Sequence, residues 1–246
     1  MPDIEPGLAL KTLARFADCI ALTAEDSRKY FSPSARTVVT GYPTRASLAN
    51  WTRKAARQKL ELGDDLPVLL VFGGSKGARS INNAVRQNLS ALLELAQLLH
   101  ISGELDWPNV QTSRQNLSKT QAARYHAFPY LHEEMGAALA AADLAVTRAG
   151  ASTLGELPHF GLPAILVPYP HAWRYQKVNA DYLAGRGAAV MIEDTKLSEK
   201  LIPTVNDLLK NPSKMKSMRE AMKHLSHPQA AAEIGRQLLA LAGERR

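Results

Sequence analysis

Two glycine-rich turns constrain this chain most, because each follows a stretch that reads as a short buried strand and precedes a helical pattern. The first turn covers residues 73–79, after the apolar run 67–72. The second covers residues 148–153, after the run 144–147. Unbroken runs of Val, Leu and Phe are typical of parallel strands that are buried on both faces. The repeated unit of strand, turn and helix therefore predicts an α/β fold around a parallel sheet.

The second turn has the residues of an anion site. Gly150 and Ala151 allow another molecule to approach the backbone closely. Ser152 and Thr153 begin a helix, whose free N–H groups and positive dipole end attract an anion. Glu156 lies one helical turn further on and would accept hydrogen bonds from sugar hydroxyls, because a carboxylate repels a phosphate. The pair Thr153 and Glu156 also fits a capping box that binds no ligand, and this stretch alone favours neither interpretation.

The first turn resembles two phosphate loops but matches neither Gly-x-x-x-x-Gly-Lys-Ser/Thr nor Gly-x-Gly-x-x-Gly. Its glycines, the Ser75 hydroxyl and the start of the following helix could still hold a phosphate. The alternative is a tight turn without a ligand. Because the carboxyl ends of parallel strands meet at one edge of a sheet, both turns are predicted at the edge where ligands bind.

Charge and composition narrow the class of partner. The 246 residues suffice for one large or two small domains, and 30 Lys and Arg against 23 Asp and Glu give a net charge of +7. This balance suits nucleotides, diphosphates, nucleic acid or an acidic membrane face. The absence of a basic run with interleaved aromatic residues argues against nucleic acid. Cys19 is the single cysteine, which points to a reducing compartment. We expect neither a metal nor a cofactor, because no His or Cys cluster has metal-ligand spacing.

The chain divides into four predicted parts. Residues 1–45 contain two short strands, at 18–22 and 36–40, which cannot enclose a core by themselves. Residues 46–66 are expected to be a linker helix, 67–225 a ligand-binding domain and 226–246 a helix that packs back toward the first part. Further strands are expected at 67–72, 98–102, 125–130, 144–147, 162–167 and 188–192. Helices are expected at 8–16, 46–63, 80–96, 136–142, 154–160, 175–184, 197–209, 213–225 and 230–241. Residues 111–121 have no assignment.

Three stretches, taken together, resemble one family. They are GGSKGARSIN at 73–82, RAGASTLGEL at 148–157 and GLPAILVPYPH at 161–171, followed by Gln176 and Asn179. They are similar to the MurG family, the UDP-N-acetylglucosamine:undecaprenyl-pyrophosphoryl-muramoyl-pentapeptide N-acetylglucosaminyltransferases of bacterial peptidoglycan synthesis. The resemblance runs from near residue 5 to the C-terminus. It implies a GT-B fold, in which this chain supplies a complete Rossmann-like C-terminal domain and the last β-α-β piece of an N-terminal domain.

The resemblance also implies which residues contact the diphosphate of a nucleotide sugar. Ser75 and Thr153 would contact it, as would the backbone around Ala151 and Ser152. Arg45 would reach a phosphate, because it matches the arginine that follows a Gly-Asn-Pro turn in the family.

The other parts of the nucleotide sugar have their own implied contacts. Glu156 would bind the ribose hydroxyls, and Gln176 would read the hydroxyls of the sugar. The backbone of Leu131 and His132 would pair with uracil. The chain departs from the family pattern just before Gln176, where residues 173–175 are Trp-Arg-Tyr instead of the usual Asp, His or Gln.

Family members begin with another α/β domain that binds the lipid acceptor, supplies the general base and docks on the cytoplasmic face of the plasma membrane. Residues 1–45 resemble only its last piece, so no catalytic base is assigned, and the apolar faces there are expected to be exposed or paired with another chain. We expect a fragment, a mis-started reading frame or half of a split enzyme, which binds UDP-N-acetylglucosamine but transfers little alone. The alternatives are a donor-binding subunit that needs an acceptor-domain partner chain and an epimerase of the same fold. The chain alone would be cytoplasmic or peripheral to the membrane.

Overall fold

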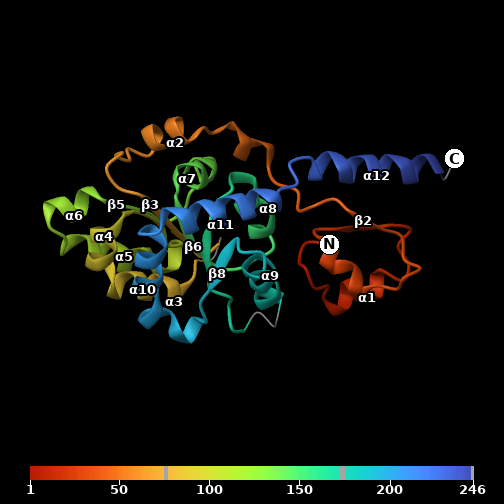
Figure 1. The fold of residues 1–246 in the computed structure, drawn as a ribbon, viewed down its shortest axis with the longest axis horizontal. Coiled ribbons are helices and arrows are strands. Elements are labelled where there is room, and N and C mark those ends of the chain that lie inside the picture. The colour runs from red at the N-terminus through yellow and green to blue at the C-terminus, as the bar shows by residue number, and fades with distance from the viewer. Residues whose placement is uncertain (75–76, 172–174, 245–246) are drawn as a thin grey trace.

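A six-stranded parallel sheet forms the centre of the larger part of the molecule (Figure 1). The computed structural model describes residues 1–74, 77–171 and 175–244. The strand order is β5-β4-β3-β6-β7-β8, and every neighbouring pair is parallel. The strands are β3 (Val68–Phe72), β4 (Gln97–Ile101), β5 (Tyr125–Phe128), β6 (Leu144–Thr147), β7 (Ala164–Leu166) and β8 (Ala189–Met191). The predicted α/β class with a parallel sheet is confirmed.

Alternate residues of the central strands enter two separate cores. Val68, Leu70 and Phe72 of β3 belong to one apolar cluster, whereas Leu69 and Val71 belong to the other. Successive side chains of a strand point to opposite faces, so a strand between two helical layers favours apolar residues on both faces, as β3 shows. This double burial explains the unbroken apolar runs in the sequence.

Helices cover both faces of the sheet. The cluster that contains Val68 is completed by α2 (Arg53–Lys59), α7 (Met135–Ala141), α8 (Thr153–Phe160) and α9 (Tyr175–Ala184). The opposite cluster is completed by α3 (Arg79–Gln87), α4 (Leu89–Leu95), α5 (Trp107–Gln115), α10 (Leu197–Leu209) and α11 (Pro212–His224). A further short helix, α6 (Lys119–Ala123), precedes β5. None of the helices within the described residues is long and apolar enough to cross a membrane.

Two predicted helices are wrong as continuous elements. The expected linker helix is interrupted, because η2 (Ala46–Asn50) ends before Thr52, whose side chain accepts a hydrogen bond from the backbone of Ala55 and starts α2. The helix expected at 80–96 is broken at Asn88, whose side chain donates to the carbonyl of Ala84 at 2.9 Å. Short polar side chains of this kind compete with the helical backbone for hydrogen bonds. Residues 111–121, for which the sequence predicted no element, cover the end of α5 and the start of α6.

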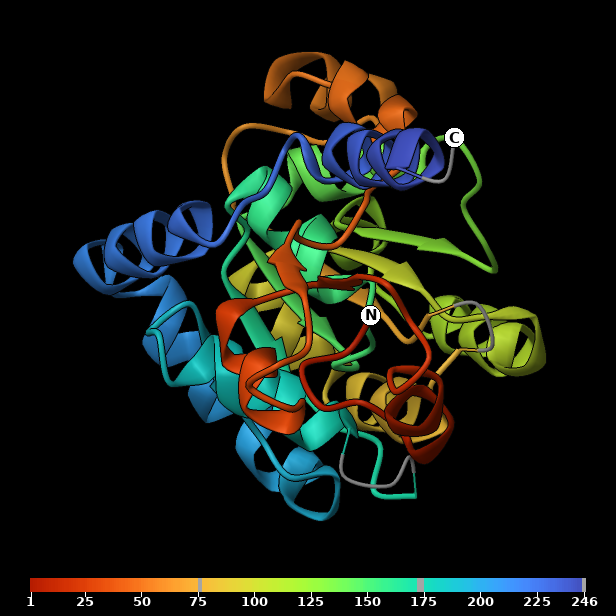
Figure 2. The ribbon, with the colours of Figure 1, turned by 90° about the vertical axis from the view of Figure 1, so that its right-hand side faces the viewer.

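Residues 1–45 form a small body that lies to one side of the main sheet in Figure 1 and faces the viewer in Figure 2. Its two-stranded parallel sheet pairs β1 (Ile20–Leu22) with β2 (Thr37–Val39), flanked by α1 (Leu8–Leu13) and η1 (Glu25–Tyr30). No residue of α1 is buried. Leu8, Leu13 and Phe16 are 81%, 63% and 82% exposed, as expected for apolar residues of so small a sheet.

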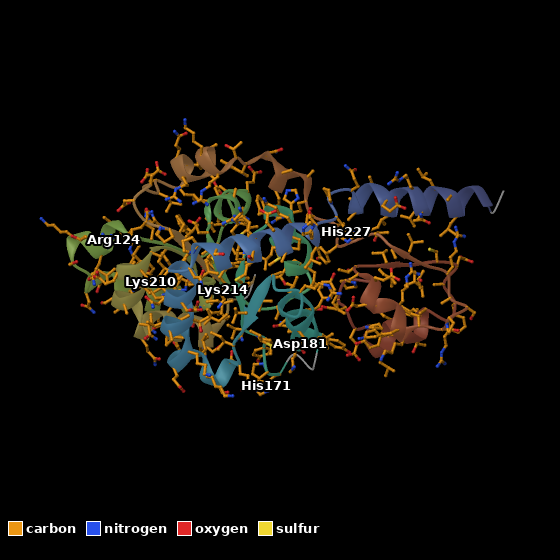
Figure 3. The ribbon with its side chains drawn as sticks, viewed as in Figure 1. Arg124, His171, Asp181, Lys210, Lys214 and His227 are labelled. Atoms are coloured by element: carbon orange, nitrogen blue, oxygen red, sulfur yellow. The ribbon has the colours of Figure 1, made fainter. Side chains whose placement is uncertain are left out.

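The last helix, α12 (Ala230–Glu244), extends from the main body on the same side as residues 1–45 (Figure 1). Figure 3 marks His227 at the point where this helix leaves the body. A Cβ atom on Gly41 would lie 2.1 Å from the Cβ of His227, so these two residues are in close contact. Leu238 and Leu239 further along the helix are exposed. The division into domains remains a prediction.

Candidate functional site

The two glycine-rich turns meet at the centre of the sheet. β3 and β6 are neighbours, and their last residues, Phe72 and Thr147, are paired. The chain builds β4 and β5 on one side of this pair and β7 and β8 on the other. A parallel sheet leaves a crevice at the carboxyl ends of its strands where the order reverses in this way, and ligands bind there.

The first turn requires glycine at defined positions. A Cβ atom on Gly73 would lie 2.3 Å from the backbone nitrogen of Ala78. Gly77 has φ +72°, and a Cβ atom there would lie 2.4 Å from the carbonyl oxygen of Ser102. Gly74 has φ +83°, and its Cβ direction is open. A side chain would therefore clash at Gly73 and Gly77, whereas the Cβ direction of Gly74 is open. The turn directly precedes α3. The predicted contact residue Ser75 lies outside the described residues.

The second turn leads into α8 without a capping box. The helix begins at Thr153, and the preceding Ser152 makes no side-chain capping hydrogen bond. The Thr153 hydroxyl instead donates to the carbonyl of Gly150 at 2.5 Å. The interpretation of Thr153 and Glu156 as a capping box is thus wrong, because Thr153 already lies inside the helix. A Cβ atom on Gly150 would have no other atom within 4 Å, so the backbone is accessible here.

Glu156 is the carboxylate next to this turn, and its surroundings have opposing effects on its pKa. Burial raises the pKa of Glu156, whereas the Arg45 guanidinium and a hydrogen bond from the Ser152 side chain lower it. Tyr42 lies against the same helix, because a Cβ atom on Gly155 would be 2.9 Å from its ring. Burial, followed by the negative charge of Glu156, raises the pKa of Tyr42. The structure therefore brings Arg45, from the end of the small body, to the first turn of α8.

Two amides of α9 have different partners. The Gln176 side-chain oxygen accepts a hydrogen bond from the Tyr169 backbone at 2.9 Å. Asn179 is fully buried. It accepts from the backbone of Ile4 at 3.0 Å and donates to the carbonyl of Ala149 at 3.1 Å. Asn179 thus joins the small body to the second turn.

The two residues predicted to pair with uracil follow β5. Leu131 is buried in the core cluster that contains α7. His132 is exposed, and its ring contacts the Tyr130 ring edge-on at a centroid distance of 4.7 Å. Because β5 is parallel to β3, these residues lie at the same edge of the sheet as the turns. Within the described ranges, no group of three or more His, Cys, Asp or Glu side chains could hold a metal ion.

The arrangement around β3 to β8 matches a known family. A model of the glycosyltransferase family 28 C-terminal domain matches residues 68–234, which is more than half of the chain. The chain belongs to this family. The matched residues 68–234 of this chain contain both glycine-rich turns, the Leu131 segment and Gln176.

Curated relatives agree with this assignment. A protein of Roseiflexus sp. (strain RS-1) is 40% identical over 270 residues, covering 95% of this chain and 61% of the relative. A protein of Chlorobaculum parvum (strain DSM 263 / NCIMB 8327) is 41% identical over 239 residues, covering 96% and 64%. Both are named UDP-N-acetylglucosamine--N-acetylmuramyl-(pentapeptide) pyrophosphoryl-undecaprenol N-acetylglucosamine transferase. The chain spans less than two thirds of the length of these relatives.

Solved structures show the same fold. The crystal structure of Acinetobacter baumannii MurG is 25% identical with a TM-score of 0.72, covering 95% of this chain and 63% of the other. A UDP-GlcNAc 2-epimerase from Neisseria meningitidis, solved with UDP-GlcNAc bound, has a TM-score of 0.64 at 16% identity, covering 92% and 62%. The epimerase likeness extends to the fold alone.

Within the family 28 domain, sequence reasoning missed a group of contacts beneath the site. Arg148 is 9% exposed and ion-paired with Asp194, and its guanidinium lies 5.2 Å from the centroid of the Tyr169 ring. The sequence carried one signal for this group, namely a charged residue placed directly after a short buried strand. Its partners come from distant parts of the chain and have no spacing that could reveal them.

Proposed function

We propose that this chain binds UDP-N-acetylglucosamine and supplies the donor-binding part of N-acetylglucosaminyl transfer to a lipid-linked muramoyl pentapeptide. The main support is the cluster of Arg45, Ser152 and Glu156 at the first turn of α8, beside the carboxyl ends of β3 and β6. A fixed carboxylate next to a helix N-terminus and an arginine suits a ligand that carries both hydroxyls and phosphates.

Each part of the donor has proposed contacts. The diphosphate would contact Ser75, Thr153 and the backbone N–H groups of Ala151 and Ser152, with Arg45 on one phosphate. An accessible backbone at Gly150 supports this assignment.

The sugars and the base would be bound on either side of the diphosphate. Glu156 would accept hydrogen bonds from the ribose hydroxyls, which requires its ionised form. The backbone of Leu131 or His132 would pair with uracil. Gln176 would donate from its NH₂ group to an N-acetylglucosamine hydroxyl, because its oxygen is already held by Tyr169.

The chemistry of the transfer fits this arrangement. The acceptor's 4-hydroxyl attacks the anomeric carbon of the sugar, the bond to the diphosphate breaks, and UDP leaves with inversion. Negative charge grows on the leaving diphosphate in the transition state. The starts of α3 and α8 and the Arg45 guanidinium would stabilise that charge. No residue of this chain is assigned as the base that accepts the hydroxyl proton.

Calorimetric titration of the purified chain with UDP-N-acetylglucosamine tests the proposal, with UDP-N-acetylgalactosamine as the control ligand. We expect selective binding of the first sugar and about tenfold weaker binding in Glu156→Gln, because hydrogen bonds to a charged group contribute about 1.5–3 kcal/mol. Equal affinity for both nucleotide sugars would overturn the proposed sugar contact. No binding of either would overturn the donor site.

A second candidate function is a donor-binding subunit that acts with a separate acceptor-binding chain at the cytoplasmic face of the membrane. The support is the apolar surface of the small body. Leu8, Leu13 and Phe16 are exposed, and a hollow of about 210 Å³ between α1 and β1 is lined by apolar side chains such as Ile20 and Phe31. Exposed apolar surface of this kind marks interaction sites.

Turnover of lipid-linked acceptor distinguishes the two candidate functions. The second predicts that the purified chain is inactive alone and becomes active when the acceptor domain of a relative is added as a separate protein. Ordinary turnover by the chain alone would contradict the subunit role. Sedimentation with anionic vesicles, with and without the added domain, tests the membrane location.

A further inference from the structure

Arg148 makes several polar contacts directly beneath the crevice. It follows the last residue of β6 and is 9% exposed. Its Nη1 donates to the carbonyl oxygens of Val167 and Pro168 at 3.1 and 3.4 Å and forms an ion pair with Asp194. Its Nη2 donates to the Ser80 hydroxyl at 2.8 Å. One guanidinium therefore contacts four residues from three other segments of the chain.

These partners belong to the loops that form the crevice edge. Ser80 lies in the first turn of α3, immediately after the first glycine-rich turn. Val167 and Pro168 follow β7, and Asp194 begins η4 (Asp194–Lys196) after β8. The Ser80 hydroxyl also donates to Asp194 at 2.7 Å, which closes the network. The ends of β6, β7 and β8 are thus joined to the start of α3.

The network extends to the residue proposed to read the sugar. The Arg148 guanidinium carbon lies 5.2 Å from the centroid of the Tyr169 ring, which is a cation–π contact. The backbone N–H of Tyr169 donates to the Gln176 side chain. Arg148 therefore acts on both ends of the proposed donor site, through Ser80 on the diphosphate side and through Tyr169 on the sugar side.

We propose that Arg148 is a positioning residue that holds these loops in the geometry needed to bind a nucleotide sugar. The proposal rests on the proposed function, since it concerns the same site. The ion pair with Asp194 neutralises the charge of Arg148, so the contribution to binding comes from geometry. A planar fork of donors can hold several acceptors at fixed angles, which a lysine ammonium cannot do.

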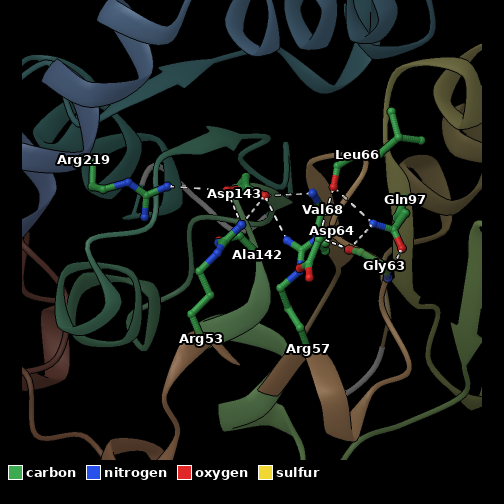
Figure 4. A network of polar contacts seen from close by, with 10 residues as sticks. All are labelled: Arg53, Arg57, Gly63, Asp64, Leu66, Val68, Gln97, Ala142, Asp143 and Arg219. Atoms are coloured by element: carbon green, nitrogen blue, oxygen red, sulfur yellow. Dashed lines mark hydrogen bonds and ion pairs between the residues drawn. The ribbon is translucent and has the colours of Figure 1, made fainter. Parts of the chain in front are cut away.

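A second buried arginine provides a matched control. Arg57 is 7% exposed, donates to the carbonyls of Gly63 and Leu66, and is ion-paired with Asp143 at 3.7 Å (Figure 4). Asp143 precedes β6, so this network lies at the amino end of the sheet, opposite the crevice. Arg148→Lys and Arg57→Lys therefore remove similar buried forks, and only the first lies beneath the site.

The test is calorimetric binding of UDP-N-acetylglucosamine to the whole chain and its variants, alongside their thermal unfolding. We expect both lysine variants to unfold at a lower temperature. We expect roughly tenfold weaker donor binding in Arg148→Lys, in proportion to the loss of a charged hydrogen bond, and wild-type affinity in Arg57→Lys. A merely structural role predicts that the two variants bind alike.

Asp194→Asn separates geometry from charge and also serves if Arg148→Lys does not fold. Removal of the carboxylate charge leaves Arg148 uncompensated. Positioning predicts weaker donor binding in this variant, whereas direct attraction between Arg148 and the diphosphate predicts tighter binding.

The outcomes are distinct. If the wild-type chain does not bind the donor, the proposed function is overturned and this inference with it. If the wild type binds and Arg148→Lys binds equally well, or if Asp194→Asn binds more tightly, the positioning role alone is overturned.

Discussion

The buried His100 should make the stability of this protein depend on pH in a predictable way. Its Nε2 lies 2.9 Å from the Asn82 side-chain oxygen, and its Nδ1 lies 2.9 Å from the Tyr125 hydroxyl. The Asn82 NH₂ group donates to Ser102 and Asp106, both at 2.8 Å, so the Asn82 oxygen must accept. His100 therefore carries its proton on Nε2 and accepts from Tyr125 at Nδ1.

Burial lowers the pKa of His100 from 6.5 to about 4. The unfolded chain takes up this proton near its ordinary pKa, whereas the folded chain resists it. The stabilising contribution is therefore complete above pH 6.5 and is lost as the pH falls from 6.5 toward 4. A tenfold change in proton affinity corresponds to about 1.36 kcal/mol, so the full loss is about 3 kcal/mol.

Urea unfolding at a series of pH values between 4 and 7.5 measures this loss. His100→Gln keeps an N–H donor for Asn82 but does not titrate in this range. We expect it to be less stable than the wild type at pH 7.5 by about 1–3 kcal/mol, since it leaves Tyr125 without its acceptor. We expect the difference to shrink as the pH falls to 4. His132→Gln, at an exposed position, serves as the control for the change from histidine to glutamine.

A constant free-energy difference between the wild type and His100→Gln across this pH range would refute the reasoning. It would mean that His100 is protonated equally in the folded and unfolded chains.

Three further outcomes follow from the site and the small body. Gly73→Ala should lower the free energy of unfolding by about 1–3 kcal/mol, since its Cβ would overlap the backbone of Ala78. Urea unfolding measures this change, and an unchanged free energy of unfolding would contradict the turn geometry. Donor affinity should fall as the pH drops from 7.5 to 5, because burial raises the pKa of Glu156 and its protonated form accepts ribose hydrogen bonds poorly. Calorimetry of Glu156→Gln should find a donor affinity that does not change over this pH range. Phe16→Ser should reduce self-association in light scattering at high protein concentration, and a wild type that is already monomeric would argue against self-association through the exposed apolar side chains of residues 8–16.

The sequence predicted those helices and strands whose own residue pattern is sufficient to determine their structure. Residues 144–147 are apolar except for Thr147 and form β6 as expected, and the helices expected at 175–184 and 197–209 match α9 and α10. The interruptions at Thr52 and Asn88 were missed because each depends on one side chain bonding to nearby backbone. Such local bonds compete closely with the helix and leave no periodic signal.

The candidate site was predicted through motifs, and the structure added the contacts between them. The glycine-rich turns could be placed at one edge because parallel strands end together. The proximity of Arg45 to Glu156 and the partners of Arg148 depend on how distant segments pack, which no local spacing encodes. The binding roles of the predicted residues remain predictions.

The buried amide of Asn179 has a consequence for how the two parts of the molecule move. It holds Ile4 and Ala149 at the same time, and its NH₂ group also donates to Asp3 at 2.8 Å. A displacement of the small body therefore pulls on the turn before α8, and an adjustment of that turn is transmitted back to the small body. Because such coupling is reciprocal, a partner that shifts the small body on binding would change the affinity of the crevice for its ligand by the same factor as that ligand changes the affinity of the small body for the partner.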